Sequence, residues 1–332
     1  MLRFDCNAKN GEWGGFLQIG RVQLANNLFM APMAGVTDCI FRSMVARFGA
    51  GLTFSEMVSA KSLVYGNKNT HRLLENDGVR PWAVQFFGHE PQIMHDAIQE
   101  LGENHPFDIV NINMGCPMPK IVNNGDGAAL MKDPVLVGQM VEAAIRASSR
   151  PVTVKIRLGF TPATKNCIEV ARAAQESGAA LVIVHGRTRD QYYTGEANWE
   201  EISAVKAALK IPVIGNGDIF VPEDALHRLA TSGCDGIMIA RGGMGNPWLF
   251  SRTLESLETG TLPPPPSDEA IIAVALEHLN EVANRRGRIE EMRKHLSWYT
   301  KGMKGSAEAR RQINAATEAG QMEAILRGMG GG

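Results

Sequence analysis

Eight short apolar runs recur along the first 240 residues of the chain, each with the length of a strand. Runs of this length without polar alternation are typical of strands that are covered on both faces. The runs are 28–31, 52–55, 82–86, 109–113, 152–156, 181–185, 213–216 and 236–240.

Stretches with apolar residues at helical spacing separate most of these runs. They lie at 38–48, 91–101, 134–147, 164–177, 199–209 and 222–231, whereas 61–74 is weakly patterned and is expected to be mostly loop. A doubly wound sheet would usually need fewer strands and a switch in strand order. The alternation therefore predicts the α/β class and, within it, a (β/α)8 TIM barrel.

Two further segments flank this repeating pattern. Residues 16–25 alternate apolar and polar positions around Gly20 and Arg21, which predicts a β-hairpin that covers one end of the barrel. Four consecutive prolines at 263–266 cannot continue a helix. We therefore expect a barrel domain with its hairpin at 1–260, a proline-rich linker at 261–266 and an all-helical domain at 267–332.

The composition of the chain limits the classes of protein to which it can belong. No apolar run approaches the roughly 20 residues of a membrane span, and residues 1–16 lack the apolar core of a secretory signal. The five cysteines are scattered and never form a C-x-x-C pair, which disfavours a disulfide framework and a structural zinc site. We expect a cytoplasmic monomer with no metal and no membrane contact.

The net charge is only −1, but residues 285–311 contain nine Lys or Arg against three acidic residues. A solvated helical surface is the commoner reason for such a run, and a phosphate-binding face is the alternative. Charge alone favours the solvated surface.

Chemically capable residues follow the ends of the predicted strands, where barrels place their active sites. Cys116 comes just after the fourth strand, between Gly115 and Pro117, in a loop that is expected to be rigid and exposed. Most free cysteines are small buried hydrophobes, and this position argues against that alternative. Lys120 follows in the same loop and is a second candidate for chemistry.

The glycine-rich ends of the seventh and eighth strands are typical of phosphate sites, although tight turns alone would also explain them. Arg241 can supply a countercharge there. Lys155 lies inside an apolar strand and needs a partner such as an anionic ligand, because an unpaired buried ammonium is costly. His185 alone would more often be a satisfied core residue, but its neighbours favour contact with a ligand.

Several of these segments together resemble the bacterial tRNA-dihydrouridine synthases. The segments are 31–38, 111–120, 154–159, 184–188 and 215–219, while 246–248 and 293–299 are most similar to the B-type branch. They span the chain from Met30 to Tyr299 in the family's order. No single segment would suffice for this resemblance.

The resemblance implies an FMN-dependent oxidoreductase. Such an enzyme is reduced by NADPH and passes a hydride from flavin N5 to C6 of a uracil in tRNA, and Cys116 would protonate C5 as general acid. The implied flavin contacts are Pro32, Met33 and Ala34 on the ring, Gln85 and Lys155 on its polar edge with His185 nearby, and Asn216, Gly217, Asp218, Ala240 and Arg241 at the phosphate. Ala240 stands where glycine is expected, and it would serve if its φ angle is negative.

The resemblance also reverses the interpretation of the basic segment, because the family's helical domain holds tRNA. Expected tRNA contacts are Asn113, Lys120, Arg187, Arg285, Arg286, Arg288, Arg293 and Lys294. No G-x-G-x-x-G follows a strand, so NADPH is expected to dock transiently on the flavin.

Three alternatives remain open from the sequence. One is an FMN-dependent barrel that acts on a small molecule, as dihydroorotate dehydrogenases do. Another is a flavin-free isomerase or aldolase that uses Lys155, and the third is a non-catalytic RNA-binding protein. The basic helical region argues against the first, and the strand-end residues argue against the last.

Overall fold

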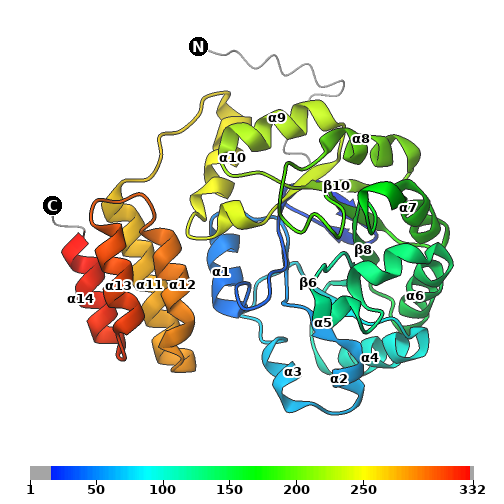
Figure 1. The fold of residues 1–332 in the computed structure, drawn as a ribbon, viewed down its shortest axis with the longest axis horizontal. Helices are drawn as coiled ribbons and strands as arrows, with labels where there is room; N and C mark the ends of the chain where they lie inside the picture. Colours follow the sequence, from blue (N-terminus) through cyan, green and yellow to red (C-terminus); the bar gives the residue numbers. More distant parts are fainter. Residues whose placement is uncertain (1–15, 330–332) are drawn as a thin grey trace.

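The computed structural model describes residues 16–329 and has the predicted (β/α)8 barrel with a helical C-terminal region (Figure 1). Each of the eight apolar runs forms a parallel strand. The barrel strands are β3 (Leu28–Met30), β4 (Thr53–Phe54), β6 (Trp82–Phe87), β7 (Ile109–Met114), β8 (Val152–Arg157), β9 (Leu181–His185), β10 (Val213–Asn216) and β11 (Gly236–Ile239).

The strands are arranged in the order β3-β11-β10-β9-β8-β7-β6-β4. A parallel bridge between Phe29 and Leu52 joins the first and last of them and closes the barrel. The short strand β5 (Val58–Ser59) pairs with the C-terminal end of β6 outside this path. All strand C-termini therefore meet at one end, which we call the mouth.

The predicted hairpin forms from β1 (Gln18–Ile19) and β2 (Val22–Gln23). Ile19 and Leu24 are fully buried and pack with Phe29, Phe54 and Ile183 inside the barrel. The turn at Gly20 lies against Pro151, directly before β8 begins. The hairpin thus covers the N-terminal end of the barrel and leaves the mouth open.

The outer helices cover the sheet through a second, larger apolar cluster. They are α1 (Cys39–Arg47), α4 (Pro91–Asn104), α6 (Pro134–Ala147), α7 (Cys167–Glu176), α8 (Trp199–Ala208), α9 (Pro222–Ser232) and α10 (Trp248–Thr259). Residues 61–74 were expected to be mostly loop, but they contain much of α2 (Ala60–Val64) and all of α3 (Lys68–Arg72). Ser59 caps α2 by accepting a hydrogen bond from Ser62 N, which stabilises a helix that is too short to show periodicity.

Beyond the prolines, the chain forms α11 (Asp268–Arg286), α12 (Met292–Tyr299), α13 (Ser306–Ala315) and α14 (Ala319–Met329). This helical region packs against α1 (Figure 1). Ile40 and Met44 of α1 share an apolar cluster with Leu279 and Leu296. The barrel and the helical region are therefore joined by a common core as well as by the linker. No helix within residues 16–329 is long and apolar enough to cross a membrane.

Candidate active site

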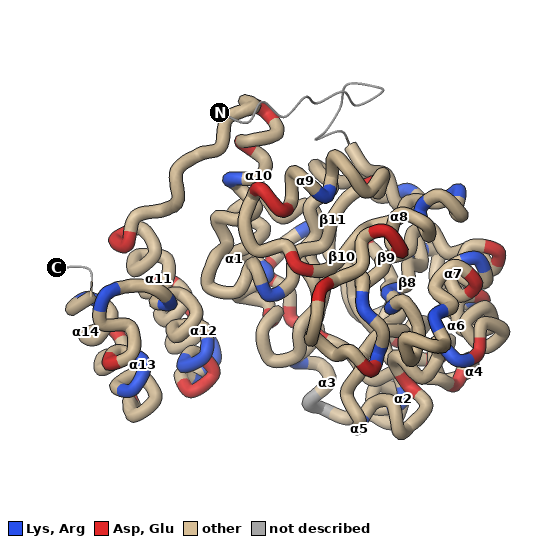
Figure 2. Tube along the Cα trace, turned by 45° about the horizontal axis from the view of Figure 1, so that its top comes forward, with Lys and Arg blue, Asp and Glu red and all other residues tan. Residues whose placement is uncertain are grey.

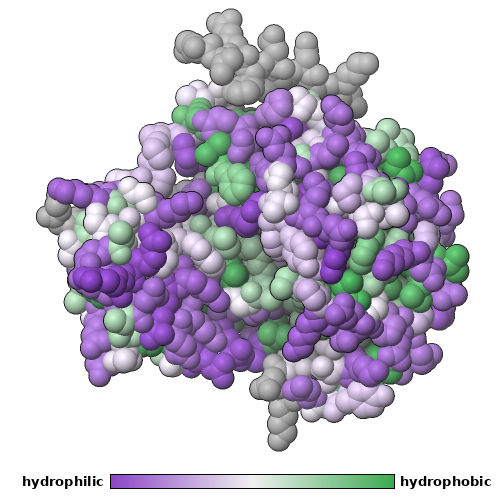
Figure 3. Space-filling view, in the orientation of Figure 1, coloured by the Kyte–Doolittle hydropathy of each residue, from purple (hydrophilic) through white to green (hydrophobic). Residues whose placement is uncertain are grey.

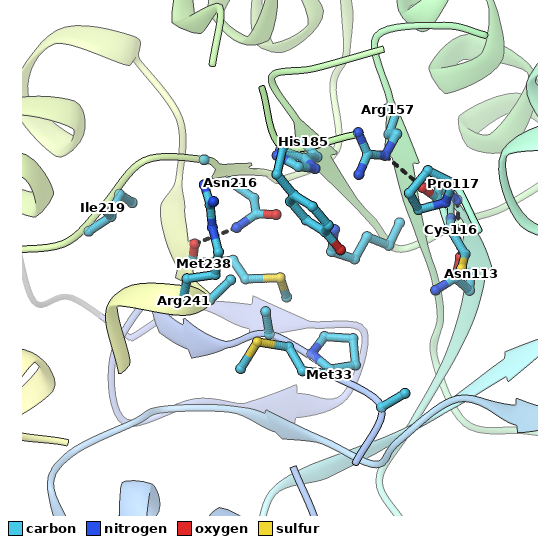
Figure 4. A pocket seen from close by; sticks show the side chains of 18 of the residues that line it. Met33, Asn113, Cys116, Pro117, Arg157, His185, Asn216, Ile219, Met238 and Arg241 are labelled. Carbon is cyan, nitrogen blue, oxygen red and sulfur yellow. Dashed lines mark hydrogen bonds between the residues drawn. The ribbon is translucent and has the colours of Figure 1, made fainter. Parts of the chain in front are cut away.

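A pocket of about 470 Å³ opens at the mouth of the barrel and is built from strand ends that lie far apart in sequence (Figures 3 and 4). This volume lies in the usual range of small-ligand sites. The sequence-predicted residues that line it are Pro32, Met33, Ala34, Asn113, Cys116, Lys155, His185, Asn216, Gly217, Asp218, Ala240 and Arg241. Cys116 and Arg241 lie on opposite sides of the cavity (Figure 4).

The loop that carries Cys116 is fixed by hydrogen bonds from two strands. The Oδ1 atom of Asn113 accepts from Gly115 N at 3.1 Å and from Cys116 N at 2.8 Å. Arg157 Nε donates to the Gly115 carbonyl oxygen at 2.7 Å, and Ala128 N donates to the Cys116 carbonyl oxygen at 3.0 Å. These contacts hold the backbone on both sides of the thiol.

Burial raises the pKa of the Cys116 thiol. The Met118 amide and the cations Arg157 and Lys155 oppose this shift without reversing it. The thiol is therefore protonated at neutral pH and able to donate a proton to a bound group.

Lys155 lines the same pocket. Burial, together with the charge of the nearby Arg157, lowers the pKa of its ammonium to about 7. Within residues 16–329 the ammonium forms no hydrogen bond and no ion pair. A ligand with an anionic or carbonyl edge would supply the missing partner and favour the charged form.

His185 ends β9 and is nearly buried, with 8% of its surface exposed. Burial and four surrounding cations hold its pKa well below the ordinary value, so the imidazole is neutral. Its ring lies 6.5 Å from the ring of Tyr193. A neutral imidazole can donate or accept a hydrogen bond at a bound ring without adding charge.

The opposite side of the pocket carries unpaired backbone amides. The N–H groups of 217–219 and 240–242 make no hydrogen bond within the part of the chain that the structure describes. All six residues line the pocket. Successive free amides of this kind form a nest for an anion. Ala240 has a φ of −117°, so the alanine fits without left-handed strain.

Asp218 organises this nest. It has a φ of 50°, which is uncommon for a residue other than glycine. Its carboxylate pairs with Arg187 at 2.7 Å and with Arg241 at 3.2 Å, and it accepts a hydrogen bond from Ala197 N at 2.7 Å. The two arginines leave a net positive charge beside the free amides.

Arg187 and Gln85 differ from their expected positions. Arg187 is 1% exposed and donates to Thr194 O, Gly195 O and Asp218, which is at odds with the expected contact with tRNA. Gln85 is fully buried. Its side-chain amide donates a hydrogen bond to Asn111 and accepts one from Asn113. Gln85 therefore lies behind Asn113, which lines the pocket, and does not line the pocket itself.

The expected tRNA residues of the helical region do not form one free cationic surface. Arg285 pairs with Asp77, and Arg286 pairs with Asp38 in the barrel. Arg288 lies 3.5 Å from Glu291, and Arg293 donates to the Ala316 carbonyl oxygen. Figure 2 shows the basic residues of α12 beside acidic residues of the turn that directly precedes it, Glu290 and Glu291. The side chain of Arg286 is only 9% exposed, so direct phosphate contact by this residue is at odds with the structure.

Two site residues were given no role from the sequence. Arg157 ends β8 and was noted only as one of the residues at the strand ends. Tyr193 lies in the loop after β9 and lines the pocket between the guanidinium groups of Arg157 and Arg241. No pattern marked it. Lys120 lines a second cavity of about 620 Å³ beside the Cys116 loop.

A barrel whose mouth combines a protonated thiol, an unpaired ammonium and free backbone amides has the features of an enzyme site suited to an anionic ligand. Residues 29–328 match the family model described as dihydrouridine synthase. The chain belongs to this dihydrouridine synthase family, whose members are flavin-dependent oxidoreductases. The resemblance found in the sequence motifs is therefore confirmed.

Named relatives are similar over nearly their whole length. A probable tRNA-dihydrouridine synthase of Rickettsia bellii is 41% identical over 304 residues, which cover 90% of this chain and 93% of the relative. The tRNA-dihydrouridine synthase B of Xanthomonas campestris is 42% identical and that of Pseudomonas putida 41%, each over 90% of this chain and over 91% and 90% of the relative respectively.

Solved structures with much lower identity share the fold. Histamine dehydrogenase from Rhizobium sp. 4-9 has a TM-score of 0.58 at 12% identity, over 87% of this chain and 50% of that chain. Morphinone reductase has a TM-score of 0.52 at 14% identity, over 79% of this chain and 94% of that chain.

Proposed function

We propose that this enzyme binds FMN at the mouth of the barrel, accepts electrons from NADPH and reduces the C5–C6 double bond of specific uridines in tRNA. The observation that carries the proposal is the Cys116 thiol, which faces the anion nest around Arg241 across a single pocket (Figure 4). The relatives at 41% and 42% identity are named tRNA-dihydrouridine synthases, which supports tRNA as the substrate.

The residues present fit FMN. The six free amides of 217–219 and 240–242, together with Arg241, suit the phosphate end. Pro32, Met33 and Ala34 offer an apolar wall for the isoalloxazine ring. The unpaired ammonium of Lys155 suits the polar edge of the ring, where negative charge builds on reduction.

When bound, reduced FMN supplies a hydride for C6 of the uracil. Cys116 then delivers the proton to C5, so the double bond gains one hydride and one proton in total. The raised pKa of the Cys116 thiol keeps this proton in place until carbanion character develops at C5. Asn113 and Arg157 position the thiol through the Gly115–Cys116 backbone.

The pocket lies at the bottom of the mouth, where a stacked base cannot reach. The target uridine must therefore leave its stack and enter the pocket. The neutral imidazole of His185 and the ring of Tyr193 offer ring surfaces and hydrogen-bonding groups to it.

An anaerobic single-turnover experiment tests this proposal. The purified protein is reduced with NADPH and mixed with unmodified tRNA transcript, while flavin absorbance and dihydrouridine content are followed together. Reoxidation with matching dihydrouridine formation is expected. A flavin that reduces but stays reduced with every tRNA from the source cell would contradict the tRNA substrate, and protein without flavin would contradict the cofactor.

A further inference from the structure

Helix α12 lies directly against the loops that form the pocket. Gly245 follows the pocket residue Met244 and has a φ of 66°. A Cβ atom at Gly245 would lie 2.5 Å from the carbonyl carbon of Trp298 and 2.6 Å from the backbone nitrogen of Tyr299. The backbones are therefore in contact, and the helical region packs directly against the loop that carries Met244.

Lys294 of α12 reaches the rim of the pocket from this position. Its Nζ atom lies 3.1 Å from a Cβ built on Gly35, the residue directly after the pocket residue Ala34. Glu56, from the loop after β4, accepts a hydrogen bond from Gly35 N and forms no ion pair with a cation among the described residues. The Lys294 ammonium is thus close to the pocket without being neutralised.

The other basic residues expected to bind tRNA in this region are already engaged. Arg285, Arg286 and Arg288 each pair with a carboxylate, and Arg293 donates to a carbonyl oxygen. Within residues 16–329 the Lys294 ammonium makes no hydrogen bond or ion pair. Among the basic residues of the helical region that were expected to bind tRNA, Lys294 is therefore the one whose charge is unpaired near the mouth of the barrel.

We propose that Lys294 binds a backbone phosphate of the very nucleotide whose uracil enters the pocket. This inference rests on the proposed function. A flipped base brings its ribose and flanking phosphates to the rim, where they lose contacts with their former neighbours. An ammonium fixed on the rim offsets that loss only when the base is inserted, so Lys294 favours insertion rather than binding of tRNA in general.

The test uses the flavin-loaded full chain and a Lys294→Gln variant, with Lys304→Gln as the matched control. Lys304 is exposed, lies in the same helical region and has no partner within the described residues. Both variants should retain flavin and the wild-type rate of reduction by NADPH. At saturating tRNA, Lys294→Gln should slow flavin reoxidation about tenfold, the size of one charge-assisted contact, whereas Lys304→Gln should not.

A second measurement isolates the phosphate. Two ligated tRNAs are prepared with an uncharged methylphosphonate on the 5′ or the 3′ side of the mapped target uridine. One of them should slow the wild-type enzyme about tenfold and leave Lys294→Gln unaffected, because the contact is already lost. Equal slowing of both enzymes by each tRNA would overturn the inference. A wild-type enzyme that forms no dihydrouridine would instead overturn the proposed function.

Discussion

The guanidinium of Arg157 holds the carbonyl oxygen of Gly115 at 2.7 Å, directly before the candidate catalytic thiol. The same side chain donates to Thr188 O at 2.8 Å and to Tyr192 O at 2.9 Å. One buried residue therefore ties the loop after β7 to the loop after β9. Burial lowers its pKa to about 10, so the guanidinium remains charged at neutral pH.

Replacing Arg157 by lysine should loosen both loops, because one ammonium cannot reproduce three donors in a fixed plane. We expect a loss of about 2 kcal/mol in the free energy of unfolding, together with slower turnover on tRNA. Urea unfolding and steady-state kinetics check the two effects. Arg146→Lys on the exposed face of α6 is the control and should change neither. If Arg157→Lys unfolds at the same urea concentration as the wild type, the structural role of Arg157 is contradicted.

Cys116→Ala should remove the proton donor while leaving the flavin site intact. Flavin content and the rate of reduction by NADPH should match the wild type. The rate of dihydrouridine formation should fall about 10²-fold to 10⁴-fold, the usual size of general-acid catalysis. Cys167→Ala removes another buried thiol, on α7, and should retain activity. Turnover by Cys116→Ala at the wild-type rate would exclude the acid role.

Gly217→Ala should expel the flavin phosphate. Gly217 has a φ of 141°, and an added Cβ would lie 2.5 Å from Ala197 Cβ, so the nest must shift. Gly233, the C-cap of α9, is the matched control, since it also has a positive φ, of 68°, but a Cβ added there would have nothing within 4 Å. Gly233→Ala should cost about 1 kcal/mol and retain flavin. Retention of flavin by both variants would place the phosphate elsewhere.

The buried ammonium of Lys155 should make the flavin-free protein more stable as pH rises above neutral. Its folded-state pKa is about 7, against an ordinary value of 10.5. Between these values the unfolded chain binds the additional proton, so the free energy of unfolding increases with pH. Below about 7 both states are protonated and this contribution to the slope disappears.

Urea unfolding at pH 7, 8 and 9 measures this slope in flavin-free protein. Lys155→Met is the reference, because it removes the titrating group and keeps an unbranched side chain of similar length. The wild type should gain stability relative to Lys155→Met over this range. Parallel curves would show that the ammonium finds a partner in the flavin-free protein.

Arg286 should act through the contact between the domains rather than through RNA. Its side chain is 9% exposed and pairs with Asp38, which is 14% exposed and also caps α1. Arg286→Leu should cost about 3 kcal/mol in the free energy of unfolding, because it leaves a partly buried carboxylate unpaired. It should weaken tRNA binding without changing the salt slope. A weaker dependence of tRNA affinity on salt concentration in the variant would instead indicate that Arg286 contacts a phosphate directly.

The sequence by itself determined the architecture of the barrel. Eight apolar runs predicted eight strands because burial on both faces of a parallel strand excludes polar residues locally. The same local rule placed Cys116 and Asp218 after strands and Lys155 within the C-terminal half of one. Barrel geometry then brought the strand ends to one mouth. Ala240 was expected to fit with a negative φ, and it does.

Tertiary structure decided which of these residues face a ligand. Gln85 and Arg187 lie at strand ends like Lys155, yet the amide of Gln85 is hydrogen-bonded to Asn111 and Asn113. The guanidinium of Arg187 donates to Thr194, Gly195 and Asp218. The free Lys294 and the engaged Arg286 belong to one basic segment. Sequence gives the charge of such residues, but the partner of each depends on segments hundreds of residues away, which only the fold brings together.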